Sequence, residues 1–147
     1  MSTYNFATAA VIGTGMMGPV IAATLALGGV RSTILSRAGE SARKALETAR
    51  RQVRLREENG LAEPAQAARA IDLLDASTDF DNAIARADLV IESAPENMDF
   101  KQDLFARMDA LARPEAILAS NTSGLRDRKS TRLNSSHHVV SRMPSSA

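Results

Sequence analysis

The 147-residue chain contains no cysteine, and only 3% of its residues are aromatic. The absence of cysteine excludes a disulfide framework, a thiol nucleophile and a cysteine-based zinc site, and it is typical of a cytoplasmic protein. With so few aromatic residues, a hydrophobic fraction of 44% predicts one small globular domain with an aliphatic core. The formal net charge of +1 is too balanced to indicate a nucleic-acid partner or an anionic membrane surface.

Charge is also missing from the first 30 residues, and residues 6–30 are almost entirely small or apolar. A membrane-spanning helix needs about 20 apolar residues, so the length alone would allow one. The stretch is interrupted, however, by three glycines and a proline between residues 13 and 19. Two short elements joined by a turn are therefore favoured over a span. A signal peptide is disfavoured because the positively charged start is absent, and we expect no membrane partner.

The remaining pattern alternates short apolar runs with longer amphipathic segments. The predicted strands are 9–12, 32–35, around 73–74, 89–91 and 116–119, and the predicted helices are 20–27, 38–59, 65–70, 81–86 and 100–111. Alternating strands and helices indicate an α/β fold with a mostly parallel, doubly wound sheet. The helices at 38–59 and 65–70 form an insertion between the second and third strands. The sheet is expected to be truncated after about its fifth strand.

A glycine-rich segment joins the first strand to the first helix. The residues Gly13, Gly15 and Gly18 fit the pattern G-x-G-x-x-G, with Met16 and Met17 between the last two. In this context the first glycine permits a tight turn, the second lets backbone approach a pyrophosphate, and the third allows close helix packing. The helix N-terminus would add unpaired N–H groups and the positive end of its dipole. The alternative is a glycine-rich turn of purely structural use.

The end of the second strand departs from the usual dinucleotide pattern, which places Asp or Glu there to bind the ribose 2′-hydroxyl. Here Ser36 and Arg37 follow Leu35. A hydroxyl and a guanidinium suit a 2′-phosphate better than a bare diol, so this pair favours NADP over NAD. The alternative is that Ser36 is only a helix N-cap, without a capping-box partner.

Two further segments and one lysine make a family resemblance specific. Residues 88–97 read Asp-Leu-Val-Ile-Glu-Ser-Ala-Pro-Glu-Asn, Lys101 follows, and residues 118–123 read Leu-Ala-Ser-Asn-Thr-Ser. Together with the glycine segment, in this order and spacing, they resemble the NAD-binding region of the 3-hydroxyacyl-CoA dehydrogenases. The resemblance covers residues 6 to about 125 and implies a Rossmann-type domain over 1–126 that binds NAD.

The resemblance also implies roles for individual residues. Glu96 and Lys101 match residues that contact the cofactor beside its nicotinamide half, and Asn121 matches one near the nicotinamide ribose. Ser123 matches the serine that hydrogen-bonds the 3-oxygen of the substrate, and it is the one catalytic residue expected here. A solvated surface pair is the alternative for Glu96 and Lys101, and a turn or cap hydroxyl is the alternative for Ser123.

The family's general base is not found in this chain. The family uses a His-Glu pair to remove the substrate hydroxyl proton, with the histidine in a His-Phe-Phe-Asn-Pro segment. The only histidines here are His137 and His138, and they match neither that segment nor a metal site. The resemblance therefore implies oxidation of a short or medium 3-hydroxyacyl-CoA, or of a related 3-hydroxy acid, by the longer protein, and an inactive chain as given. A non-catalytic dinucleotide-binding module is the alternative.

Residues 127–147 break every periodicity that precedes them. Residues 127–136 can be encoded by GAT CGG AAG AGC ACA CGT CTG AAC TCC AGT, which resembles an adapter used in short-read DNA sequencing, and residues 141–147 fit the far part of that adapter in the same frame. We therefore expect a non-native, disordered tail, against the alternative of a natural serine-rich one. The resemblance then implies a missing portion with a sixth strand, the catalytic pair and a helical domain through which the protein forms a homodimer.

Overall fold

The structure is a computed structural model that describes residues 5–93, 98–121 and 139–142. Of residues 98–101 and 139–142 it describes the backbone alone. The strands are β1 (Thr8–Ile12), β2 (Arg31–Leu35), β3 (Leu74–Ser77), β4 (Leu89–Glu92), β5 (Ile117–Ser120) and β6 (Val139–Arg142). The helices are α1 (Met17–Leu27), α2 (Gly39–Glu58), α3 (Pro64–Leu73), α4 (Phe80–Arg86) and α5 (Met98–Leu111).

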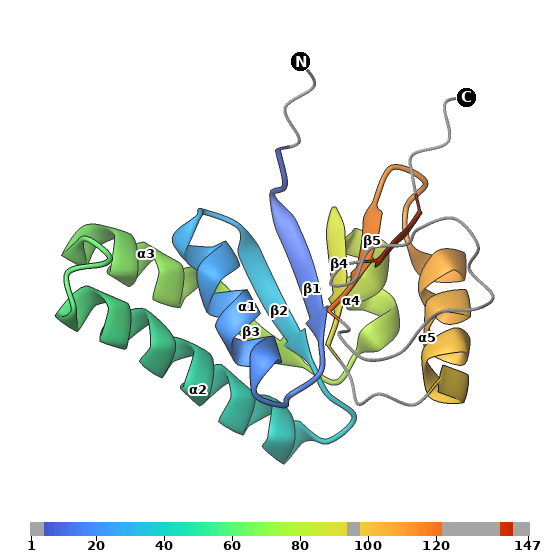
Figure 1. The fold of residues 1–147 in the computed structure, drawn as a ribbon, viewed down its shortest axis with the longest axis horizontal. Helices are drawn as coiled ribbons and strands as arrows, with labels where there is room; N and C mark the ends of the chain where they lie inside the picture. Colours follow the sequence, from blue (N-terminus) through green and yellow to red (C-terminus); the bar gives the residue numbers. More distant parts are fainter. Residues whose placement is uncertain (1–4, 94–97, 122–138, 143–147) are drawn as a thin grey trace.

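All six strands belong to one open sheet, in the order β3-β2-β1-β4-β5-β6. The first five of these are paired in parallel, and helices connect them along the chain (Figure 1). This confirms the expected Rossmann-type doubly wound fold. The strand order runs one way from β1 to β3 and then the other way from β1 to β5. The carboxyl ends of β1 and β4 therefore flank the point at which ligands bind in sheets of this kind.

Helices cover both faces of the sheet, α1, α2 and α3 on one side and α4 and α5 on the other (Figure 1). The two core layers use alternate residues of the same strand, as the period of a strand requires. On β1, Ala10 and Ile12 pack with α4 and α5, whereas Val11 packs with α1 and α2. Both layers consist largely of alanine and branched aliphatic side chains, in agreement with the aliphatic core that the composition predicts.

Residues 6–30, apolar enough to resemble a span, fold as a strand, a glycine loop and an 11-residue helix. In the part of the chain that the structure describes, no helix is both long and apolar enough to cross a membrane. The helical insertion between the second and third strands is present as α2 and α3, with Ala42, Ala49 and Val53 on the buried face of α2.

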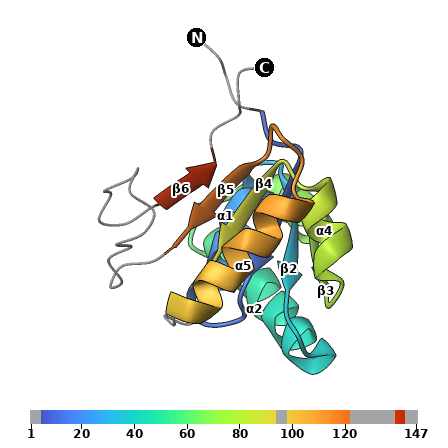
Figure 2. The ribbon, with the colours of Figure 1, turned by 90° about the vertical axis from the view of Figure 1, so that its right-hand side faces the viewer.

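Two features differ from the expected pattern. The third strand lies at Leu74–Ser77 rather than around residues 73–74, because α3 continues to Leu73. The strand β6 lies within the segment for which no secondary structure is expected, and it pairs with β5 in antiparallel orientation (Figure 2). Its two adjacent valines are β-branched, and β5 would otherwise end the sheet with an unpaired edge. The non-native origin of residues 127–147 stays a prediction.

Candidate functional site

The loop after β1 makes a tight turn that only glycine adopts readily. Gly13 has a φ of 120°, which side chains of other residues disfavour. Its N–H donates a hydrogen bond to the carbonyl of Leu35, with an N···O distance of 3.2 Å. The end of β1 is therefore tied to the end of β2, and the loop turns across the carboxyl edge of the sheet toward α1.

The other two glycines of the loop serve different purposes. A Cβ added at Gly18 would lie 3.0 Å from the carbonyl carbon of Gly13 and closer still to its oxygen, so a side chain there would collide with backbone. A Cβ added at Gly15 would meet nothing within 4 Å. Gly18 therefore allows α1 to start against the loop, whereas Gly15 leaves the outer side of the loop open to a ligand.

The N-terminus of α1 lies at this open side. The helix begins at Met17, its N-cap Met16 makes no side-chain capping bond, and its first turn contains no acidic residue. The Met16 side chain is 90% exposed, and Pro19 in the first turn has no N–H to satisfy. An uncapped helix start of this kind presents N–H donors and a positive dipole end, which suit an anionic group.

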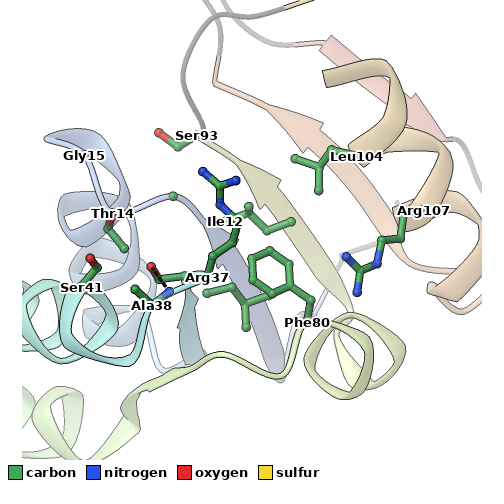
Figure 3. Close-up of a pocket in the computed structure, with 13 residues that line it drawn as sticks. Ile12, Thr14, Gly15, Arg37, Ala38, Ser41, Phe80, Ser93, Leu104 and Arg107 are labelled. Carbon is green, nitrogen blue, oxygen red and sulfur yellow. Dashed lines mark hydrogen bonds between the residues drawn. The ribbon is translucent and has the colours of Figure 1, made fainter. Parts of the chain in front are cut away.

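A cavity of about 520 Å³ lies beside the glycine loop (Figure 3). It is formed at the carboxyl ends of β1, β2 and β4 and closed by residues of α2, α4 and α5. Its lining residues are Ile12, Gly13, Thr14, Gly15, Leu35, Ser36, Arg37, Ala38, Ser41, Phe80, Ser93, Leu104 and Arg107. The volume falls within the usual range for small-molecule sites, and a mostly apolar wall with a few polar groups is typical of them.

The wall opposite the loop comes from α4 and α5. The Arg107 guanidinium lies over the Phe80 ring, 5.7 Å from its centroid. It also pairs with Asp81, with an N···O distance of 2.5 Å. These contacts hold Arg107 on the α4 and α5 side of the cavity, where Phe80 and Leu104 supply the apolar side chains (Figure 3).

The structure brings four of the expected site residues together, since Gly13, Gly15, Ser36 and Arg37 all line the cavity. Met16, Met17 and Gly18 continue the same loop into α1. Ser36 is not the N-cap of α2, because the N-cap is Ala38. Instead, the Ser36 hydroxyl accepts a hydrogen bond from the Ala38 N–H at 3.4 Å. The N-cap alternative for Ser36 is therefore wrong.

The expected residues of the nicotinamide half are less completely described. Asn121 directly follows β5, and its side-chain amide donates to the Ser93 hydroxyl at 3.5 Å. Lys101 belongs to α5, but its side chain lies outside the described residues, as do Glu96, Ser123 and the two histidines. In the described ranges, no three His, Asp or Glu side chains come close enough to form a metal site.

Glu92 and Ser120 form a buried hydrogen-bonded pair next to Asn121. Glu92, at the end of β4, is fully buried, and it accepts a hydrogen bond from the Ser120 hydroxyl with an O···O distance of 2.5 Å. The carbonyl of Glu92 also accepts from the Asn121 N–H at 2.7 Å. The pair therefore joins the ends of β4 and β5 at the point where Ser93 and Asn121 leave the sheet.

We expect the substitution Ser120→Ala to lower the free energy of unfolding by about 1–3 kcal/mol, because it removes a donor from a buried carboxylate. Chemical denaturation of the purified chain measures this change. The matched control is Thr48→Ala, which removes an exposed hydroxyl that bonds only to a carbonyl of its own helix. Equal stability of Ser120→Ala and the unsubstituted chain would show that the pair contributes nothing.

Several lining residues are not identified by the sequence. Thr14 and Ser93 had a local signal, since one lies inside the glycine loop and the other directly follows a buried strand. Phe80, Leu104 and Arg107 had none, because they come from α4 and α5 and reach the cavity only through tertiary packing.

Comparison with known proteins decides the family. The family described as "3-hydroxyacyl-CoA dehydrogenase, NAD binding domain" matches residues 8–141. The chain belongs to this family. It is therefore a Rossmann-type NAD-binding domain, and NAD is the cofactor that the family description names.

Individual relatives agree with this assignment. The chain is 38% identical over 120 residues to 5-formyl-3-hydroxy-2-methylpyridine 4-carboxylate 5-dehydrogenase of Mesorhizobium japonicum, covering 79% of this chain and 37% of that protein. It is 42% identical over 83 residues to L-carnitine dehydrogenase of Streptomyces coelicolor, covering 55% and 25%. The crystal structure of 3-hydroxybutyryl-CoA dehydrogenase from Escherichia coli K12 superposes with a TM-score of 0.76 at 33% identity, covering 83% and 26%. The chain thus spans less than two-fifths of the length of each of these proteins.

Proposed function

We propose that this chain is the cofactor-binding part of an enzyme that oxidises a 3-hydroxyacyl-CoA to the 3-oxoacyl-CoA. The observation that supports this most strongly is the open glycine loop beside the uncapped start of α1, at the edge of a cavity on the carboxyl ends of the strands. A dinucleotide fits this arrangement, because its diphosphate needs closely approaching backbone N–H groups and its adenosine needs an apolar wall. When bound, the nicotinamide accepts the hydride that leaves carbon 3 of the substrate.

In this proposal the loop from Gly13 to Gly18 holds the diphosphate, and the Phe80 side of the cavity holds the adenosine half. Asn121, Glu96 and Lys101 orient the nicotinamide half, and Ser123 hydrogen-bonds the 3-oxygen of the substrate. The family similarity and the position of Asn121 after β5 support these roles. A base that takes the hydroxyl proton is also required, and this sequence lacks the family's histidine segment. We therefore propose that the chain binds the cofactor without turning over substrate.

The loop proposal is tested with Gly15→Asp in the full 147-residue chain. An added side chain at Gly15 meets open space, so the variant should fold normally. Its carboxylate would repel the diphosphate, and we expect the affinity for NADH, measured by fluorescence titration, to fall at least tenfold.

The control for that experiment is Ala68→Asp, which adds the same charge at an exposed position of α3 and should leave NADH binding unchanged. If Gly15→Asp binds NADH as tightly as the unsubstituted chain does, the diphosphate is not held by this loop.

Mixing the chain with NAD and 3-hydroxybutyryl-CoA should produce no NADH, and sustained turnover would overturn the proposed inactivity.

A second candidate is oxidation of a related 3-hydroxy acid that is not attached to CoA, and the similarity to an L-carnitine dehydrogenase favours it. Both candidates use the same cofactor loop, so cofactor binding does not separate them. Joining residues 1–126 to the substrate-binding part of the Escherichia coli 3-hydroxybutyryl-CoA dehydrogenase, and assaying acyl-CoA and free-acid substrates, would show whether this cofactor domain supports the first reaction.

A further inference from the structure

The charge of the cavity is unusual for a site that binds NAD. Among the described residues that line it, two are arginines, Arg37 and Arg107, and none is acidic. Figure 3 shows the Arg37 side chain within the cavity and Arg107 on the side of α5. Arg37 lies two residues after the end of β2, whereas Arg107 belongs to α5, so Arg37 is the cationic group that a ligand near β2 would meet.

The absence of a carboxylate at this place matters for cofactor choice. A carboxylate after the second strand binds the 2′-hydroxyl of the adenosine ribose in NAD sites and would repel a phosphate on that oxygen. Here β2 ends at Leu35, and the nearest acidic residue along the chain is Glu40. Its carboxylate pairs with Lys44 at 3.0 Å, its side chain is mostly exposed, and it does not line the cavity. No acidic residue among the described lining residues would repel a 2′-phosphate.

Donors for such a phosphate are present at the same edge. Arg37 offers a planar guanidinium that can form two parallel charge-assisted bonds to phosphate oxygens. The Ser36 hydroxyl accepts from the Ala38 N–H, and this leaves its own hydrogen to be donated. Ser41 adds a second hydroxyl from the first turn of α2. These three residues lie next to the Gly13 loop. The adenosine ribose, which is attached to the diphosphate, would lie at this place.

We infer that Ser36, Arg37 and Ser41 form a subsite for the 2′-phosphate of the adenosine ribose, so that this chain prefers NADP(H) to NAD(H). The inference rests on the proposed function, since it places the adenosine half of a dinucleotide in the cavity. The cofactor inferred for this chain thus differs from NAD, which its family description names. Arg37 is the residue that determines the preference, because it supplies the only charge directed at the phosphate by the described lining near β2.

The experiment compares two probes that differ only in the phosphate at issue, 2′,5′-ADP and 5′-AMP. Each is titrated calorimetrically into the full 147-residue chain, beside NADPH and NADH. We expect 2′,5′-ADP to bind at least tenfold more tightly than 5′-AMP, and the difference to shrink as salt is raised. Arg37→Ser should remove most of the difference, while Arg43→Ser, which removes an exposed arginine paired with Glu47 on α2, should keep it.

The outcomes separate this inference from the proposed function. If NADH binds but 2′,5′-ADP has no advantage over 5′-AMP, the subsite is overturned and the cofactor-binding function stands. If the advantage persists in Arg37→Ser, the phosphate is recognised by other groups and the assignment of Arg37 is wrong. If none of the four ligands binds, both proposals fail. The two probes lack the nicotinamide, so the result is independent of Glu96, Lys101 and Ser123.

Discussion

Replacing Gly18 with alanine is expected to lower the free energy of unfolding by about 1–3 kcal/mol, the usual cost of overpacking a closely packed site. The added Cβ would collide with the carbonyl of Gly13. Because that carbonyl is backbone, either the loop or the start of α1 has to move. Either movement shifts the N–H groups that face the open side of the loop, so NADH affinity should fall at least tenfold as well. Urea denaturation and NADH titration measure the two effects.

Gly15→Ala is the matched control, since the same methyl group is added three residues earlier in open space. We expect its stability to be unchanged within about 0.5 kcal/mol. Its NADH affinity should still decrease, because a side chain at that position keeps a diphosphate from approaching the backbone. The two substitutions would thus separate the effect of helix packing from the effect of ligand approach. A Gly18→Ala chain with unchanged stability and affinity would contradict the close contact between α1 and the loop.

The parts of the fold that the sequence predicted are those with strong local signals. The run from Leu89 to Ile91 is a buried strand in both the pattern and the structure, since consecutive apolar residues suit a strand covered on both faces. The third strand was less clear, because β3 is an edge strand with Asp75 and Ser77 in its four residues. Polar residues at an edge weaken the pattern without preventing the pairing, so the strand was placed too early.

The candidate site likewise has parts that the sequence predicts and parts that it does not. The glycine loop and the Ser36-Arg37 pair are contiguous in sequence, and a strand–turn–helix context is enough to suggest their chemistry. The apolar wall of Phe80 and Leu104 could not be predicted, because it depends on how α4 and α5 pack on the sheet. The pairing of Glu92 with Ser120 joins residues 28 positions apart. Its prediction would require the register between β4 and β5, which no local pattern contains.

The other large effect on stability is expected at Asp88, which makes long-range contacts at the end of the sheet opposite the cavity. One carboxylate oxygen of Asp88 accepts hydrogen bonds from the N–H groups of Ala7 and Thr8, at 2.8 and 3.0 Å, and from the Thr8 hydroxyl at 3.2 Å. Its other oxygen pairs with Arg113. The backbone of Asp88 also bonds to Thr8 and Ile117. One side chain therefore joins the starts of β1 and β4 to the segment before β5.

We expect Asp88→Ala to lower the free energy of unfolding by about 2–3 kcal/mol at pH 7, because it leaves the donors of Ala7 and Thr8 without their acceptor and leaves the partly buried Arg113 only its longer pair with Glu115. The control is Asp72→Ala, an exposed position on α3, which should change stability by less than about 0.5 kcal/mol. Urea denaturation measures both. The cavity is formed at the opposite ends of the strands, so the folded fraction of Asp88→Ala should bind NADH with unchanged affinity. Loss of affinity without loss of stability would contradict a purely structural role.

The same contacts predict a pH dependence. Burial raises the pKa of Asp88, but the hydrogen bonds from Thr8 and Ala7 and the bond and charge of Arg113 outweigh it, so the pKa lies below its ordinary value of 3.8. A carboxyl group whose pKa is lower in the folded state stabilises that state fully above its unfolded pKa, and the stabilisation is lost as the pH falls through the folded pKa. The stability difference between the unsubstituted chain and the isosteric Asp88→Asn should therefore be constant near pH 7 and narrow below about pH 4. Comparing the two chains cancels the titration of the other carboxyl groups, and a difference that stays constant down to pH 2 would show that the charge of Asp88 does not stabilise the fold.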